Sequence, residues 1–253
     1  MGIGSRSYAR PYASGGGLPQ GIQLLLIANV AIFLLQYFGL GDFLLTYFAL
    51  RPAAVVTSFS IWQLASYMFL HGGVFHILFN MLALWMFGRE LEEMWGMRNF
   101  LRFYFFTGIG AGVCIVLVNY LFGNPNSFTI GASGAIYGIL LASTLYWPDR
   151  VVYFYGLFPI AMKYLVIIYG AIAFLGATNT NSGVSDIGHL GGLLCGWIYL
   201  KSPLGNTRRT YVRRTSLLQR AREAYKAWKF ERNKRRFQVY MKKHGSDRQP
   251  PVN

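Results

Sequence analysis

The chain has 253 residues, of which 54% are hydrophobic, 17% aromatic and only 13% charged. Soluble domains usually carry about a quarter charged residues, so the composition excludes a water-soluble core as the main body. The net charge of +15 would fit a nucleic-acid-binding protein. However, 16 of the 24 Lys and Arg residues lie in 201–253, and the remainder of the chain is nearly balanced. We therefore expect a membrane protein with a basic tail, and no nucleic-acid partner.

Six long apolar runs predict membrane-spanning helices, because few charged residues interrupt them. The residues before the first run, 1–20, are polar and glycine-rich and predict a flexible N-terminus. The first run is longer than the core of a signal peptide, which favours an uncleaved span. The predicted spans are 21–40, 72–88, 100–122, 131–147, 152–175 and 186–200.

Segment 41–71 is apolar but contains Gly41, Arg51 and Pro52. This pattern predicts a partly immersed loop with short helices and not a seventh span. Backbone groups at membrane depth must find hydrogen-bond partners within the protein, so we expect this loop to pack against the helices.

The positions of Lys and Arg predict the orientation in the membrane. Basic residues precede the first span, flank the turn between the second and third, separate the fourth from the fifth, and follow the sixth. The connections 123–130 and 176–185 contain none. The positive-inside rule therefore predicts six crossings with both termini in the cytoplasm. We expect three parts: 1–20, a membrane domain over 21–200, and a cytoplasmic tail over 201–253.

The tail carries apolar side chains at helical spacing between basic ones. This pattern predicts an amphipathic helix that binds anionic lipids of the inner leaflet. A solvated charged tail that only enforces topology explains the same composition. The apolar positions are Leu217, Leu218, Ala221, Tyr225 and Trp228.

Ser133 lies in Gly131-Ala132-Ser133-Gly134, at the start of the fourth predicted span. Glycines allow a tight turn, and a helix that begins here leaves N–H groups free to bind an oxyanion. The alternative is that these small residues serve only close helix packing. The segment is not the Gly-x-Ser-x-Gly elbow of α/β-hydrolases, because residue 135 is alanine.

His189 lies near the start of the sixth predicted span, before the pair Gly192 and Gly196. This glycine pair lets the helix approach a neighbour closely. The imidazole could act as a general base, or it could form a structural hydrogen bond between helices. Both His189 and Ser133 fall about one turn, roughly 5 Å, below the outer face, so their side chains can meet.

His76 and Asn80 are four residues apart and share one face of the second span. Both can donate hydrogen bonds to an oxyanion near Ser133. Metal binding by His71, His76 and His189 is the rival, but their spacing matches no zinc motif. We therefore expect no metal at these histidines.

Asp186 is the only acid near His189 in the sequence. It could complete a catalytic triad, or it could cap or charge the N-terminus of the sixth helix, and we favour the role at the helix N-terminus. Tyr137 lies four residues after Ser133 and can hold the imidazole by packing. The sequence thus predicts a Ser–His dyad oriented by an aromatic ring.

Over residues 20–200 these motifs, in this order on these spans, resemble the rhomboid family of intramembrane serine proteases. The resemblance implies an all-α membrane protein with a six-transmembrane-helix rhomboid bundle and a water-filled cavity open to the outer face. It implies a serine endopeptidase that cuts single-span membrane proteins, which enter past the fifth span, without a cofactor. The implied roles are nucleophile for Ser133, base for His189, oxyanion donors for His76 and Asn80, and support from Gly131, Tyr137, Gly192 and Gly196.

Two residues depart from the family pattern. Gln63 follows Trp62 where many members have arginine, and Gly188 stands where alanine is common.

We expect the chain in a bacterial inner membrane. Two other functions fit a bundle of this kind: a silent protein that binds membrane clients, and a small-solute carrier. The carrier predicts an internal repeat, and none is evident between the halves.

Overall fold

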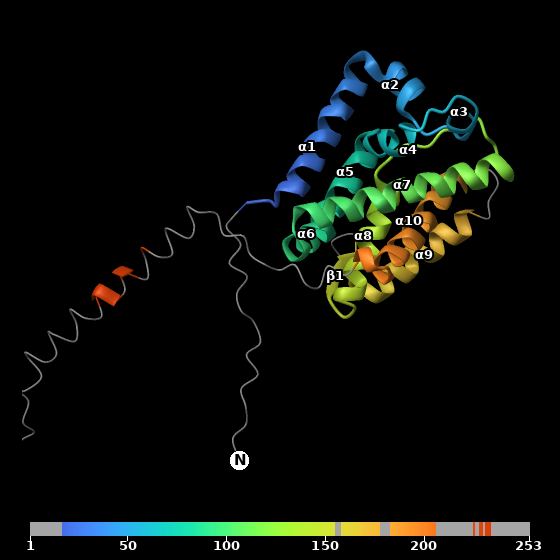
Figure 1. The fold of residues 1–253 in the computed structure, drawn as a ribbon. Helices are drawn as coiled ribbons and strands as arrows, with labels where there is room; N and C mark the ends of the chain where they lie inside the picture. The colour runs from blue at the N-terminus through green and yellow to red at the C-terminus, as the bar shows by residue number, and fades with distance from the viewer. Residues whose placement is uncertain are drawn as a thin grey trace, which may run out of the picture. The chain divides into compact units, whose positions relative to one another are not determined.

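The computed structural model describes residues 17–154, 158–177 and 183–205, and in the tail Tyr225, Trp228, Lys229 and 231–233. The chain divides into two compact units, Met1–Tyr211 and Val212–Asn253. Figure 1 shows the helices of the first unit. In chain order its elements are α1 (Gln20–Leu35), η1 (Gln36–Leu40), α2 (Gly41–Phe48), α3 (Pro52–Thr57), α4 (Gln63–Ser66), η2 (Tyr67–Phe69), α5 (Val74–Ala83), η3 (Leu84–Gly88), α6 (Arg89–Trp95), α7 (Met97–Leu121), α8 (Ser133–Tyr146), β1 (Val151–Phe154), β2 (Phe158–Ala161), α9 (Met162–Ala177), α10 (Gly183–Lys201) and η4 (Pro203–Gly205).

Three helical stretches are long and apolar enough to cross a membrane: Gln20–Phe48, Val74–Trp95 and Met97–Leu121. The first of these is kinked at Phe38 and Gly39, whose backbone angles are not helical. Two shorter apolar helices, Ser133–Tyr146 and Met162–Ala177, follow them. With α10, the described residues thus contain six helical segments in the predicted order. This arrangement is consistent with the six predicted spans.

The predicted start of the fifth span is wrong. The strands β1 and β2 pair antiparallel, with Val151 opposite Ala161 and Phe154 opposite Phe158, and α9 begins only at Met162. Valine and aromatic residues favour extended structure, and a short apolar run does not distinguish a strand from a helix. The sixth helix likewise begins at Gly183, three residues before its predicted start.

The loop predicted over 41–71 is confirmed as a chain of short helices, which gather at the C-terminal end of α1 (Figure 1). The Trp62 indole N–H donates to the Tyr47 carbonyl at 2.9 Å, and the Ser66 hydroxyl donates to the Phe48 carbonyl at 2.8 Å. Both α3 and α4 pack against α7. The loop thus satisfies part of its own backbone and rests on the helices, as a partly immersed segment requires.

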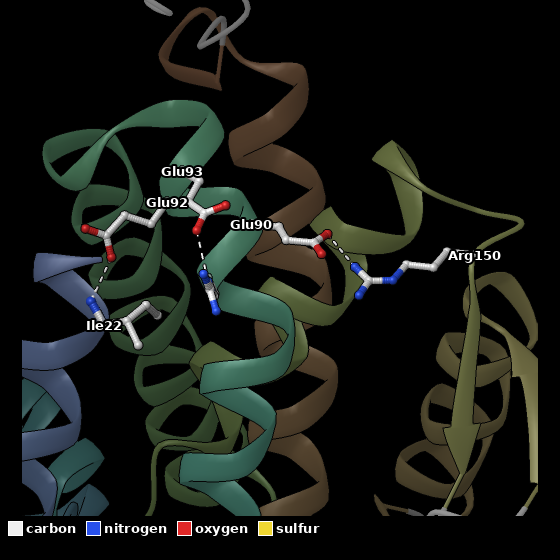
Figure 2. Close-up of polar contacts among 6 residues, drawn as sticks. Ile22, Glu90, Glu92, Glu93 and Arg150 are labelled. Atoms are coloured by element: carbon white, nitrogen blue, oxygen red, sulfur yellow. Dashed lines mark hydrogen bonds and ion pairs between the residues drawn. The ribbon is translucent and has the colours of Figure 1, made fainter. Parts of the chain in front are cut away.

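Buried and half-buried acids on α6 connect three parts of the bundle (Figure 2). The Glu92 carboxylate accepts the backbone N–H groups of Gly21 and Ile22, each at 2.7 Å. These amides belong to the first turn of α1, where no helical partner exists. Glu90 pairs with Arg150, which lies just after α8. The acids therefore tie α6 to the start of α1 and to the end of α8.

Glycines bring α10 unusually close to α8. A Cβ atom on Gly192 would lie 1.9 Å from the Gly134 carbonyl oxygen, and one on Gly196 would lie 3.1 Å from Gly138 Cα. The backbones therefore touch along this seam, as the spacing of Gly192 and Gly196 predicts. Because α10 also packs against α7 and α9, its position within the bundle is fixed from three sides.

In the second unit the described residues are helical. The rings of Tyr225 and Trp228 stack with centroids 6.0 Å apart, and the Arg232 guanidinium lies 5.2 Å from the Trp228 ring centroid. The other apolar positions of the predicted amphipathic helix lie outside the described residues, so that helix stays a prediction.

Candidate active site

The turn before Ser133 depends on Gly131. Its backbone has φ +122°, a conformation that residues with a Cβ rarely adopt. Its N–H donates to the Tyr67 carbonyl at 2.9 Å, which fixes the turn to the loop 41–71. The helix α8 begins at Ser133, and its first backbone hydrogen bond runs from the Ile136 N–H to the Ala132 carbonyl at 3.1 Å, so the N–H groups of Ser133, Gly134 and Ala135 have no acceptor within the helix. Ser133 therefore stands at a helix end with free backbone donors.

Ser133 and His189 are brought together across the seam between α8 and α10. The distance between Ser133 Oγ and His189 Nε2 is 2.9 Å, a hydrogen-bond distance. These residues are 56 positions apart in the sequence. Only a close approach of the two backbones allows short side chains at these positions to meet.

Tyr137 holds the imidazole from one side. Its ring stacks on the His189 ring with centroids 4.2 Å apart and an interplanar angle of 5°. Tyr169 of α9 also contacts Tyr137 edge to face, with ring centroids 6.0 Å apart. The aromatic contact restricts rotation of the imidazole, so Nε2 stays directed at Ser133.

His76 presents a donor to the same space. The Gly72 N–H donates to His76 Nδ1 at 3.2 Å, so Nδ1 is the acceptor and a neutral ring carries its proton on Nε2. That nitrogen faces Gly131, since a Cβ atom there would lie 2.8 Å from it. Asn80 uses one amide hydrogen to bind the His76 carbonyl at 2.9 Å, and its amide has a second hydrogen to donate.

These side chains line a cavity of about 420 Å³. The sequence did not single out its apolar wall, although Phe75 and Phe79 lie on one helix face at the spacing of His76 and Asn80. Within the described residues, no group of three or more His, Cys, Asp or Glu side chains is arranged to hold a metal. The cavity is lined by Phe75, His76, Phe79, Asn80, Ala83, Phe87, Ile130, Ser133, Ile136, Tyr137, Leu140, Tyr169 and His189.

Asp186 does not cap α10, but it places a negative charge in the first turn of the helix, which was the other form of the expected role. The helix begins at Gly183, so Asp186 belongs to its first turn. One turn along the same face, His189 Nδ1 lies 3.5 Å from Asp186 Oδ1. We expected a cap because the residues before 186 are largely polar, and the hydropathy pattern therefore placed the start of the helix too late.

Comparison with known proteins identifies the family. A family model described as a rhomboid domain matches residues 58–202, more than half of the chain. This chain belongs to the rhomboid family. The predicted fold class, a helical membrane protein with the rhomboid bundle, is thereby confirmed, with the short strands β1 and β2 as an addition. The helices are consistent with the six predicted spans.

Several curated rhomboid proteins are similar to this chain. RHOMBOID-like protein 1 of Arabidopsis thaliana is 31% identical over 159 residues, which cover 61% of this chain and 39% of that protein. Rhomboid protease GluP of Bacillus subtilis (strain 168) is 33% identical, covering 59% of this chain and 27% of its own length. Rhomboid protease AarA of Providencia stuartii is 32% identical over 53% of each chain. The chain thus spans about half or less of the length of these relatives.

Proposed function

We propose that the chain is an intramembrane serine endopeptidase that cleaves single-span membrane proteins near the outer face. The observation that carries this proposal is the 2.9 Å contact between Ser133 Oγ and His189 Nε2, which opens into a cavity with the donors of His76 and Asn80. Similarity to two relatives named as rhomboid proteases supports the activity class.

The proposed reaction is acyl transfer in two steps. Ser133 Oγ attacks the scissile carbonyl carbon while its proton passes to His189 Nε2. The carbonyl oxygen becomes an oxyanion, held by His76 Nε2–H, the Asn80 amide and the Ser133 backbone N–H. The C–N bond then breaks, and His189 returns the proton to the leaving amine. Water then attacks the carbonyl carbon of the acyl-enzyme while its proton passes to His189 Nε2. The bond to Ser133 Oγ breaks and His189 returns the proton to that oxygen, which frees the carboxyl product and restores the Ser133 hydroxyl.

The substrate must present its backbone in an unwound form, because a helix keeps its carbonyls bonded internally. Helix-weakening residues near the outer end of the substrate span should therefore favour cleavage. We propose lateral entry past α9, since Tyr169 on that helix lines the cavity and many of the outward-facing side chains of α9 are exposed.

The deciding experiment is cleavage of a single-span reporter by the full chain in liposomes. Ser133→Ala should abolish cleavage and labelling by a fluorophosphonate probe. Ser127→Ala is the matched control, because this partly exposed serine precedes α8 and bonds only the local Asn124 carbonyl among the described contacts. Equal cleavage by wild type and Ser133→Ala would overturn the proposal. An inert wild type that still binds the reporter would instead favour the client-binding function.

We further propose a multi-pass inner-membrane location with both termini in the cytoplasm and a tail that binds anionic lipids. The domain division, 1–20, 21–200 and 201–253, belongs to the same proposal. The basic composition of the tail and the exposed Trp228 support it. Reporter fusions at each end of the chain test the orientation. Flotation of the full chain and a tail-truncated form with anionic and neutral vesicles tests the lipid contact.

A further inference from the structure

We propose that Asp186 is a positioning residue for His189, so that a carboxylate supports the Ser–His pair from behind. The inference rests on the proposed protease function and adds a third residue to that site. Asp186 and His189 are three residues apart on α10 and therefore lie on one helix face.

The contact concerns the imidazole nitrogen that does not face the serine. In the proposed mechanism Nε2 is the base that accepts the Ser133 hydroxyl proton, and in that tautomer the neutral His189 ring carries its own proton on Nδ1. Among the residues that the structure describes, this buried Nδ1 has no hydrogen-bond partner. Asp186 Oδ1 lies 3.5 Å from it, within ion-pair distance and a small side-chain rotation away from a hydrogen bond. Catalytic hydrogen bonds are often long without substrate and shorten in the complex.

The neighbouring helix leaves room for this carboxylate only because residue 176 is glycine. A Cβ atom on Gly176 of α9 would lie 2.2 Å from Asp186 Oδ2 and 2.5 Å from its Cγ. The carboxylate therefore occupies the space between α9 and the imidazole. Any larger residue at 176 would displace it.

The chemical role is electrostatic. When His189 takes the Ser133 proton it becomes an imidazolium, and a carboxylate facing Nδ1–H stabilises that charge as it forms. Asp186 keeps its own charge throughout and transfers no proton. Its place in the first turn of α10 is also one where a helix favours negative charge.

The test is reporter cleavage by the full-length Asp186→Asn variant. We expect kcat to fall by on the order of tenfold with KM unchanged, because only the charged state of His189 loses support. The acidic limb of the pH profile of kcat/KM should move to lower pH. The titratable groups around His189 are Asp186 on α10, His76 on α5 and Tyr137 on α8, and Tyr169 of α9 faces Tyr137. Asp186→Glu should recover part of kcat.

Two further variants separate positioning from folding. Gly176→Ala leaves Asp186 intact but displaces its carboxylate, so it should reproduce the loss of kcat. Asp42→Asn is the control, because it removes an exposed acid from the first turn of α2. If Asp186→Asn lowers the melting temperature, its loss of kcat could come from folding. The kcat of Gly176→Ala, which keeps Asp186, then shows whether the position of the carboxylate matters.

The outcomes distinguish the two proposals. If Ser133→Ala abolishes cleavage while Asp186→Asn and Gly176→Ala match Asp42→Asn in kcat and pH profile, the Asp186 inference is wrong and the protease function stands. If the wild type itself does not cleave, the protease function fails.

Discussion

Gly131 is the residue at which backbone and side-chain requirements coincide. Its φ of +122° disfavours any residue with a Cβ, and a Cβ there would lie 2.8 Å from His76 Nε2. We expect Gly131→Ala to lower kcat/KM by about a hundredfold, because the turn before Ser133 and the His76 ring must both shift. The free energy of unfolding should fall by about 1–2 kcal/mol.

Reporter cleavage and thermal unfolding in detergent test this expectation. Gly73→Ala is the control, because a Cβ atom there would meet no other atom within 4 Å and its φ needs no glycine. An active Gly131→Ala variant would show that the turn before α8 does not hold the oxyanion donors in place.

The seam between α8 and α10 governs the site at the scale of whole helices. In Gly192→Ala the new Cβ would lie 1.9 Å from the Gly134 carbonyl oxygen, so the helices must separate. We expect a loss of about 1–3 kcal/mol in stability and a larger loss in kcat, since His189 moves away from Ser133.

Gly170→Ala on α9 is a matched control for this substitution, because its nearest neighbour would be Leu193 Cδ1 at an ordinary 3.6 Å. It should be neutral or slightly stabilising, since alanine is the better helix former. Equal activity of both variants would contradict the importance of the seam.

Glu92, a residue that is only 4% exposed, connects α6 to α1 through its carboxylate. Glu92→Gln replaces one acceptor oxygen with a donor that faces backbone N–H groups (Figure 2). We expect a loss of about 1–3 kcal/mol, measured by thermal unfolding, with cleavage retained at low temperature. Glu93→Gln, which removes a partly exposed pair with Arg89, should cost at most about 1 kcal/mol. Similar losses in the two variants would argue against the capping role of Glu92.

For the molecule as a whole, acid should weaken the fold through His71. This residue precedes α5, and burial together with the nearby His76 lowers its pKa from 6.5 to about 4. Between these values the unfolded chain binds the proton more readily, so stability is full above pH 6.5 and falls as the pH drops towards 4. The loss should reach about 3 kcal/mol at most.

Thermal unfolding of the wild type and His71→Gln over this pH range measures the effect. The variant lacks the titrating ring, so its stability should change less with pH. If stability changes with pH to the same extent in the wild type and in His71→Gln, the acid sensitivity belongs to groups other than His71.

The sequence predicted the helical architecture of the molecule because its cause is local. A bilayer requires long apolar runs, and Lys and Arg positions bias their orientation, so span order could be predicted from composition along the chain. The loop 41–71 was recognisable because Arg51 and Pro52 interrupt it. The strand pair β1 and β2 was missed, since its apolar residues continue into α9 and hydropathy does not distinguish a strand from a helix here.

The candidate site could be predicted only in part. Ser133, His189, His76 and Asn80 were each weak signals, and what connected them was a common depth derived from the spans. Only the tertiary structure shows the 2.9 Å contact between Ser133 and His189, the stacked Tyr137, and the place of Asp186 behind the imidazole. These features depend on how closely α8, α9 and α10 approach one another, and that distance is set by glycines whose partners lie far away in the sequence.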